Sequence, residues 1–138
     1  MDAFDKLLAK WQPTALSLFR FITGLLLLQY GIAKIFKFPV LPYFANIPPL
    51  ITAAGAIELV GGALLLLGLF TRPIAFILAG EMAFAYFLGH MFKTPAAPVF
   101  LPLINGGTAA ILFCFACLYL ATAGGGPYSL DSIVRKKS

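Results

Sequence analysis

The feature that most constrains this chain is a series of long apolar runs, each close to the ~20 residues that a helix needs to span a membrane. The runs cover about 14–36, 50–70, 73–92 and 101–123 of the 138 residues. This length fits one domain. The pattern therefore predicts an all-α membrane protein, a bundle of four transmembrane helices.

The charge content supports a membrane environment. Only 11% of the residues are charged and 61% are hydrophobic, whereas soluble domains are about one-quarter charged. The net charge of +5 comes from basic residues placed between the apolar runs, without the basic patch of a nucleic-acid-binding surface. We therefore expect lipid, and no nucleic acid, as a partner.

Three segments are expected along the chain: 1–12, 13–126 and 127–138. In the first, Phe4, Leu7, Leu8 and Trp11 follow the spacing of an amphipathic helix, which predicts an interfacial N-terminal helix. A frayed polar tail is the alternative that the sequence leaves open. The middle segment is the transmembrane domain, and the last is predicted to be a mobile basic tail.

The connections between the runs predict the topology. The connection around Thr71 is so short that the second and third runs must form an antiparallel hairpin, while the proline-rich segments 37–49 and 93–100 are expected to pack over one mouth of the bundle. No cleavage site follows the first run, so we expect it to stay as an anchor. Basic residues favour the cytoplasmic side of a membrane, which predicts cytoplasmic N and C termini. That side would hold Lys6, Lys10, Arg72, Arg135, Lys136 and Lys137, against Lys37, Lys93 and the helix-end Lys34 opposite.

Arg20, Glu58 and Glu81 lie inside the apolar runs, where an ionisable group is costly and is a functional candidate by default. Helical spacing predicts that each faces the bundle interior. Depths counted from the ends of the runs predict an Arg20–Glu81 ion pair, with Glu58 close to it and neutral. Buried ions acting only as structural links between helices remain the alternative. The predicted inward stripes are Arg20, Gly24, Leu27, Gly31 and Lys34; Ile51, Ala54, Gly55, Glu58, Gly61, Gly62 and Leu65; Ile77, Leu78, Glu81, Phe84, Ala85 and Leu88; and Asn105, Thr108, Ala109 and Leu112.

A second polar layer is predicted near the outer mouth. It contains Lys34, His90 and Asn105, with Gln29 and Tyr86 deeper. His90 is either a ligand-binding group or an ordinary histidine at the membrane surface.

The two cysteines lie inside the last run and predict no extracellular disulfide framework. Cys114 and Cys117 have the spacing of a redox dithiol. However, helical geometry turns them away from the Asn105–Thr108 face, and buried free cysteine is a common small apolar residue.

Several motifs together resemble the DoxX family of small bacterial membrane proteins. They are RFITG and YGIAK in the first run, GAIELVGGALLLLGLFTR across the second and third, and LPLINGG at the fourth. The resemblance implies a four-helix core in the bacterial cytoplasmic (inner) membrane, and some members are linked to sulfur oxidation or to oxidative and thiol stress. The family often carries Glu after Asn-Gly-Gly, where this chain has Thr108. The positions that the resemblance marks are Arg20, Gly31, Lys34, Glu58, Gly61, Gly62, Asn105, Gly106 and Gly107.

The resemblance implies a quinone-linked membrane subunit of an oxidoreductase system. Glu58, Glu81 and Arg20 would form its proton and charge layer, and the ligand-binding residues would be Lys34, His90, Asn105, Thr108 and Tyr86. No covalent cofactor or metal site is predicted, because haem, flavin and iron–sulfur signatures are missing from the sequence. Electrons would come from a partner oxidoreductase or a thiol. The alternatives are a non-enzymatic assembly partner, a small proton or solute transporter, and a purely structural bundle; a homo-oligomer is also left open.

Overall fold

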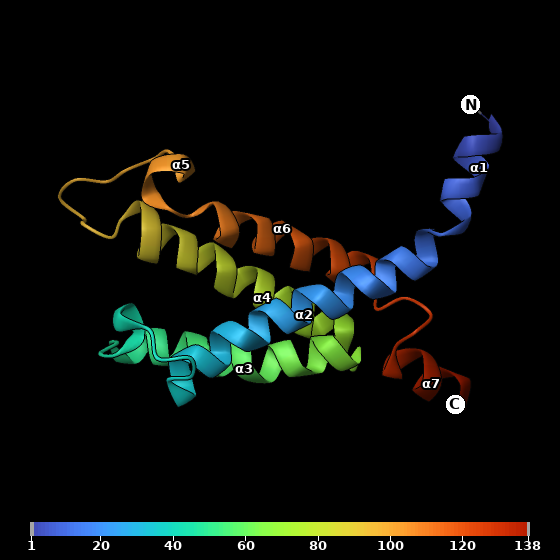
Figure 1. Ribbon diagram of the computed structural model, residues 1–138, viewed down its shortest axis with the longest axis horizontal. Helices are drawn as coiled ribbons and strands as arrows, with labels where there is room; N and C mark the ends of the chain where they lie inside the picture. Colours follow the sequence, from blue (N-terminus) through green and yellow to red (C-terminus); the bar gives the residue numbers. More distant parts are fainter. Residues whose placement is uncertain (1, 138) are drawn as a thin grey trace.

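The computed structural model describes residues 2–137, with the side chains of residues 136 and 137 excepted; in this range helices are joined by loops and there are no strands (Figure 1). The helices are α1 (Asp2–Lys10), α2 (Gln12–Phe36), α3 (Pro49–Leu67), α4 (Thr71–Tyr86), α5 (Pro102–Asn105), α6 (Thr108–Ala123) and α7 (Leu130–Lys137), with a 3-10 turn at Pro42–Phe44 and a π-helical turn at Phe87–Met91. The all-α prediction is confirmed.

Three of these helices are long and apolar enough to cross a membrane: α2, α3 and the continuous helix Thr71–Met91. The fourth predicted run is broken, and its main helix α6 has 16 residues. The break lies at Gly106, whose φ of 76° is incompatible with a continuing right-handed helix. The prediction of one unbroken helix over 101–123 is therefore wrong. That this part of the chain crosses the membrane as a fourth span stays a prediction.

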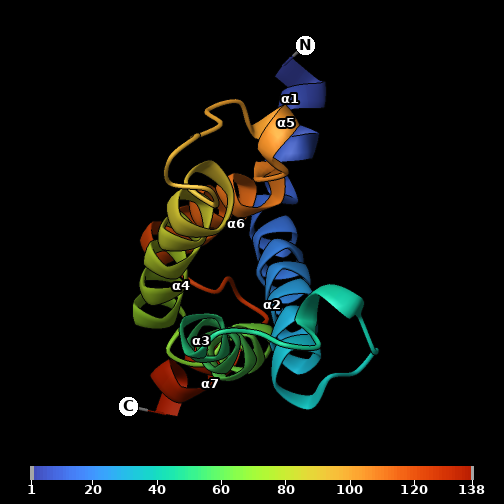
Figure 2. The same cartoon turned by 90° about the vertical axis from the view of Figure 1, so that its left-hand side faces the viewer.

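The helices pack as two pairs. α2 lies along α3, α4 lies along α6, and the short turn between α3 and α4 joins the pairs as an antiparallel hairpin, as predicted (Figures 1 and 2). Two aromatic pairs join α2 to α6, with ring centroids 6.2 Å apart between Tyr30 and Phe113 and 6.4 Å apart between Phe19 and Tyr119. The tight α2–α3 contact consequently sets the position of the groups that both helices carry.

Glycines make that tight contact. A Cβ atom on Gly24 or Gly31 would collide with the main chain of α3 at Leu66 and Leu59, and one on Gly62 would lie 2.6 Å from the Leu28 nitrogen of α2. Such small-residue seams let two helix backbones approach closely in a membrane. The inward stripe predicted for α3 is confirmed from Gly55 to Leu65.

The orientations of α4 and α6 differ from the predicted ones. The stripe predicted for α4 is confirmed at Leu78 and Glu81, but Phe84 and Leu88 are exposed. The helix buries Ala75, Ala79 and Met82 beside Leu78, because it packs against α3 and α6 at the same time. On α6, Thr108 is exposed, whereas Cys117 is fully buried. The face of α6 that points inward is thus the one opposite to that predicted.

Both ends of the described chain lie at the end of the bundle opposite the loops 37–48 and 92–101 (Figure 1). α1 has no buried residue, and its position at a membrane surface stays a prediction. The predicted mobile tail is instead helix α7, whose beginning is held by hydrogen bonds between Asp131 and the turn from α3 to α4.

Candidate functional site

A buried ion pair joins α2 and α3 within the apolar part of the bundle. The Lys34 Nζ atom lies 2.9 and 2.8 Å from the two carboxylate oxygens of Glu58. The Glu58 side chain is 1% exposed and that of Lys34 is 13% exposed. Gly55 makes room for the lysine, since a Cβ there would lie 2.7 Å from the Lys34 Cβ. The lysine starts near the end of α2 and reaches inward over Gly55 to the carboxylate.

Glu81 brings a second carboxylate to this pair. The Glu81 carboxyl group is near enough to the Glu58 carboxylate and the Lys34 ammonium group to interact with both electrostatically. Both Glu81 oxygens are nevertheless buried without a hydrogen-bond partner among the described residues. We refer to Lys34, Glu58 and Glu81 as the charged triad: one cation, two carboxylates and three helices.

The predicted Arg20–Glu81 ion pair is wrong. Arg20 is 3% exposed, and its guanidinium donates hydrogen bonds to the carbonyls of Gly125 at 2.7 Å, Tyr128 at 3.1 Å and Leu66 at 3.4 Å. Gly31 of α2 contacts the main chain of Glu58 and Leu59 in α3. Arg20 precedes Gly31 in α2 by about 16 Å along the helix axis, at ~1.5 Å per residue, and so lies far from the carboxylates. The prediction failed because α2 begins beyond the end of α3. Counting residues from the helix ends therefore placed Arg20 at the wrong depth in the bundle.

Arg20 instead attaches the C-terminal segment to the bundle. Ser17 supports it by accepting a hydrogen bond from the Tyr128 N–H at 3.1 Å. Nearby, the Asp131 carboxylate accepts the N–H groups of Phe70 at 2.8 Å and Thr71 at 2.9 Å. This arrangement closes the end of the molecule where α4 begins.

Asp131 is ionised more readily than an ordinary aspartate. Partial burial would raise its pKa, but contacts with Thr71 and Phe70 and the positive charge of Arg135 outweigh burial. The pKa of Asp131 is therefore lowered, and the carboxylate stabilises the first turn of α4.

A leucine layer separates the charged triad from the Arg20 end. Leu27, Leu65, Leu78 and Leu120, one from each of four helices, are fully buried, and the first three lie between the two levels along α2, α3 and α4. The two groups of polar residues, which the sequence suggested were one layer, are thus insulated from each other.

The predicted outer layer is brought together only in part. The Asn105 Nδ2 atom donates to the Tyr86 hydroxyl at 3.2 Å and to the Val99 carbonyl at 2.9 Å, while Tyr86 donates to the Phe100 carbonyl at 3.2 Å. The His90 Nδ1 atom lies 3.2 Å from the Asn105 carbonyl oxygen. This Tyr86–His90–Asn105 cluster includes neither Lys34, which belongs to the charged triad, nor the exposed Thr108.

The cysteines contribute to packing. Both are free; Cys117 is fully buried in the core among leucines, and Cys114 is half-buried beside it. A redox role for this pair stays a hypothesis.

Sequence reasoning missed the Lys34–Glu58 pair, although a signal was present. The short turn between α3 and α4 places Gly61 against Leu78 and, one helical turn farther, Glu58 beside Glu81. Glycines at similar intervals in α2 and α3 would have placed Lys34 opposite Gly55. Matching the two glycine patterns, instead of counting depths, would have identified the partner.

Comparison with known proteins gives two matches. The family model described as DoxX matches residues 15–91, more than half of the chain. A relative from Haemophilus influenzae, carrying the name "Uncharacterized protein", is 39% identical over 133 residues, which cover 94% of this chain and 98% of the relative. No solved structure matches.

Proposed function

The chain belongs to the DoxX family of membrane proteins, and on that premise we propose that it is the membrane subunit of an oxidoreductase system, in which Glu58 and Glu81 take up and release a proton. The family resemblance supports the link to redox chemistry. The charged triad supports the proton role.

One observation carries the proposal: the second carboxylate is surplus to a structural ion pair. Lys34 and Glu58 neutralise each other, so a purely structural link would be complete without Glu81. An ionised carboxylate buried without a donor is strongly unfavourable, whereas a carboxyl group that shares a proton with its neighbour is not. The triad is therefore built to hold one exchangeable proton.

Access to this proton is one-sided. The Lys34 side chain is 13% exposed, and its Nζ atom lies 5.7 Å from the ring centre of Phe44 in the loop that follows α2. The leucine layer blocks the opposite direction. A proton thus enters and leaves at the loop end, which suits a subunit that serves a reaction at one face of the membrane.

Quinone, the acceptor implied by the resemblance, meets side chains of the Tyr86–His90–Asn105 cluster that already bond to one another and to main-chain carbonyls. The Tyr86 hydroxyl and the Asn105 amide are engaged with each other and with the Phe100 and Val99 carbonyls. These residues do not fit a quinone as they stand, and we assign them to holding the end of α4 against α5.

The proposed location is the bacterial cytoplasmic membrane with both termini in the cytoplasm. The excess of basic residues at the end of the bundle that carries the termini supports this orientation. Proton exchange would then take place on the outer side.

Infrared spectroscopy tests the proton role. We expect the full-length protein in lipid nanodiscs at neutral pH to show the C=O stretch of a protonated carboxyl, which Glu81→Gln removes. Asp5→Asn, in the exposed α1, is the matched control and should retain the band. A wild-type protein without a protonated carboxyl at neutral pH would refute the proposal.

The redox link needs a separate measurement. Membranes that contain the wild-type protein should sustain thiol-dependent quinone reduction faster than membranes with Glu81→Gln, while Asp5→Asn membranes match the wild type. Equal rates of quinone reduction in all three membranes would refute the oxidoreductase part of the proposal without affecting the proposed proton site.

A small proton-coupled transporter is the second candidate, favoured by the meeting of charges from three helices in the bundle interior. It requires the leucine layer to open. A proton flux into proteoliposomes that is lost in the Glu58→Gln variant would support the transporter. Wild-type proteoliposomes without proton flux would exclude it.

A further inference from the structure

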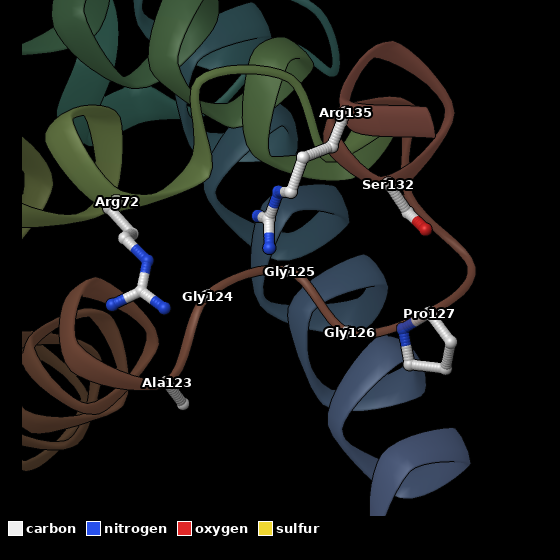
Figure 3. A pocket seen from close by; sticks show the side chains of 8 residues that line it. All are labelled: Arg72, Ala123, Gly124, Gly125, Gly126, Pro127, Ser132 and Arg135. Atoms are coloured by element: carbon white, nitrogen blue, oxygen red, sulfur yellow. The ribbon is translucent and has the colours of Figure 1, made fainter. Parts of the chain in front are cut away.

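A basic cavity lies at the end of the molecule that carries both termini. Its volume is about 450 Å³, and its lining includes Arg72, Arg135 and the glycine segment 124–126. Figure 3 shows that Arg72 comes from the start of α4 and Arg135 from α7, and that both side chains extend toward the glycine segment between them. Cationic groups thus flank a stretch of main chain that carries no side chains.

The charge around this cavity is positive. Arg20 approaches the glycine segment as well, through its hydrogen bond to the Gly125 carbonyl at 2.7 Å. The nearby carboxylate is Asp131, which faces Arg135 and accepts the N–H groups of Phe70 and Thr71. Three guanidinium groups therefore lie near the segment, and among the described residues the carboxylate close to them is that of Asp131.

Arg72 is held in place. Its Nη1 atom donates to the Thr122 carbonyl at 2.7 Å, and a Cβ on Gly124 would lie 3.3 Å from Nη2. Gly124 has a φ of 85° and Gly126 a φ of 82°, a conformation that disfavours any side chain. The guanidinium consequently lies against bare main chain, with its remaining donors available for an anion.

An apolar surface adjoins the basic one. A second cavity of about 370 Å³ shares Arg72 and Arg135 with the first and adds Phe70, Pro73 and Val134. Phe70 and Val134 are exposed. The site lies where α4 begins and α6 ends, and the ends of apolar spans lie at the level of the lipid headgroups.

We propose that these adjoining cavities bind the headgroup of an anionic phospholipid, with the phosphate between Arg72 and Arg135 and the glycerol region against Phe70, Pro73 and Val134. Guanidinium groups match phosphate oxygens in charge and in fork geometry. The apolar wall distinguishes a lipid from a free anion. This inference is independent of the proton role.

Lipid titration tests the proposal. The purified full-length protein in a nonionic detergent is titrated with phosphatidylglycerol, phosphatidylcholine or inorganic phosphate, and bound species are counted by native mass spectrometry. We expect preferential phosphatidylglycerol binding, weakened about fivefold by Arg135→Gln and by Arg72→Gln. The matched control, Lys6→Gln with Lys10→Gln, removes two charges from α1 and should change the affinity less than about twofold.

Both arginines have other contacts, since Arg72 bonds to the Thr122 carbonyl and Arg135 interacts electrostatically with Asp131, so circular dichroism of each variant must match the wild type before its affinity is compared. Unchanged phosphatidylglycerol affinity in Arg135→Gln, or an equal loss in the α1 control, would overturn the proposal. So would phosphatidylcholine binding of equal strength. Displacement of phosphatidylglycerol by an equal concentration of inorganic phosphate would assign the site to a soluble anion instead.

Discussion

Replacing Lys34 by methionine gives the most direct test of the charged triad. Methionine keeps most of the apolar stem over Gly55 but removes the ammonium group that lies 2.8 Å from Glu58. Two adjacent carboxylates would then lack their cation. We expect a large loss of stability that cannot be explained by packing.

The magnitude follows from the geometry. Unit charges 2.8 Å apart attract by ~6 kcal/mol at an effective dielectric constant of ~20, and removing one partner of a buried pair costs about 3–5 kcal/mol after desolvation is counted. The 13% exposure of Lys34 places the expected loss near the lower limit, about 3 kcal/mol.

Glu58→Gln should be milder than Lys34→Met, because Glu81 remains to neutralise the lysine. We expect Glu58→Gln to lower the unfolding free energy by about 1–2 kcal/mol. The double variant Lys34→Met, Glu58→Gln should lose about 2 kcal/mol less than the sum of the two single variants. This asymmetry is specific to one cation shared by two acids.

The assay is reversible unfolding of the full-length protein in mixed micelles by titration with dodecyl sulfate, followed by circular dichroism. Lys37→Met is the control, since this lysine makes an exposed hydrogen bond to the Phe44 carbonyl at 2.8 Å and should contribute under about 1 kcal/mol. A loss below about 1 kcal/mol in Lys34→Met, or additive effects in the double variant, would refute the reasoning.

Three further predictions use the same protein. Gly31→Ala should lower the unfolding free energy by about 2–3 kcal/mol, because its Cβ meets the α3 main chain. Gly80→Ala, with no atom near the new Cβ, should raise the unfolding free energy by ~0.5–1 kcal/mol. Equal effects of the two substitutions in the unfolding titration would disprove the glycine seam. Arg20→Gln should expose the C-terminal segment to limited proteolysis at least about tenfold faster, because hydrogen bonds to charged donors contribute ~1.5–3 kcal/mol each, while Lys10→Gln leaves the cleavage rate unchanged. Asp131→Asn should destabilise the protein by ~0.5–2 kcal/mol at neutral pH. Because the pKa of Asp131 is lowered in the folded protein, its contribution to stability is complete above the unfolded value of ~3.9 and disappears as the pH falls through the folded value. A difference in stability from the wild type that persists well below that range would contradict the assignment.

The helices themselves could be predicted from the sequence because they depend on local properties. Apolar run length identified α2, α3 and α4, and the spacing of Gly55, Glu58 and Leu65 identified the buried face of α3. These features repeat within one helix, so no knowledge of a neighbour is needed. The break at Gly106 was missed because the glycine lies in a run that is apolar enough to read as continuous.

The site was predicted only in part. Arg20, Glu58 and Glu81 were recognised as unusual for an apolar run, whereas Lys34, the cation of the triad, was assigned to a separate outer layer. Pairing depends on how far α2 slides along α3, and a displacement of about 16 Å changes which cation meets the carboxylates without altering the pattern of either helix.

The sequence by itself therefore determined that ionisable groups would be held inside a helical membrane protein, because hydropathy and helical periodicity are written into each segment. Only the tertiary structure decided that Lys34 serves Glu58 and Glu81 while Arg20 secures the chain end. The glycine seam sets that axial position, and close contact between two backbones is a property of the pair of helices that neither one carries alone.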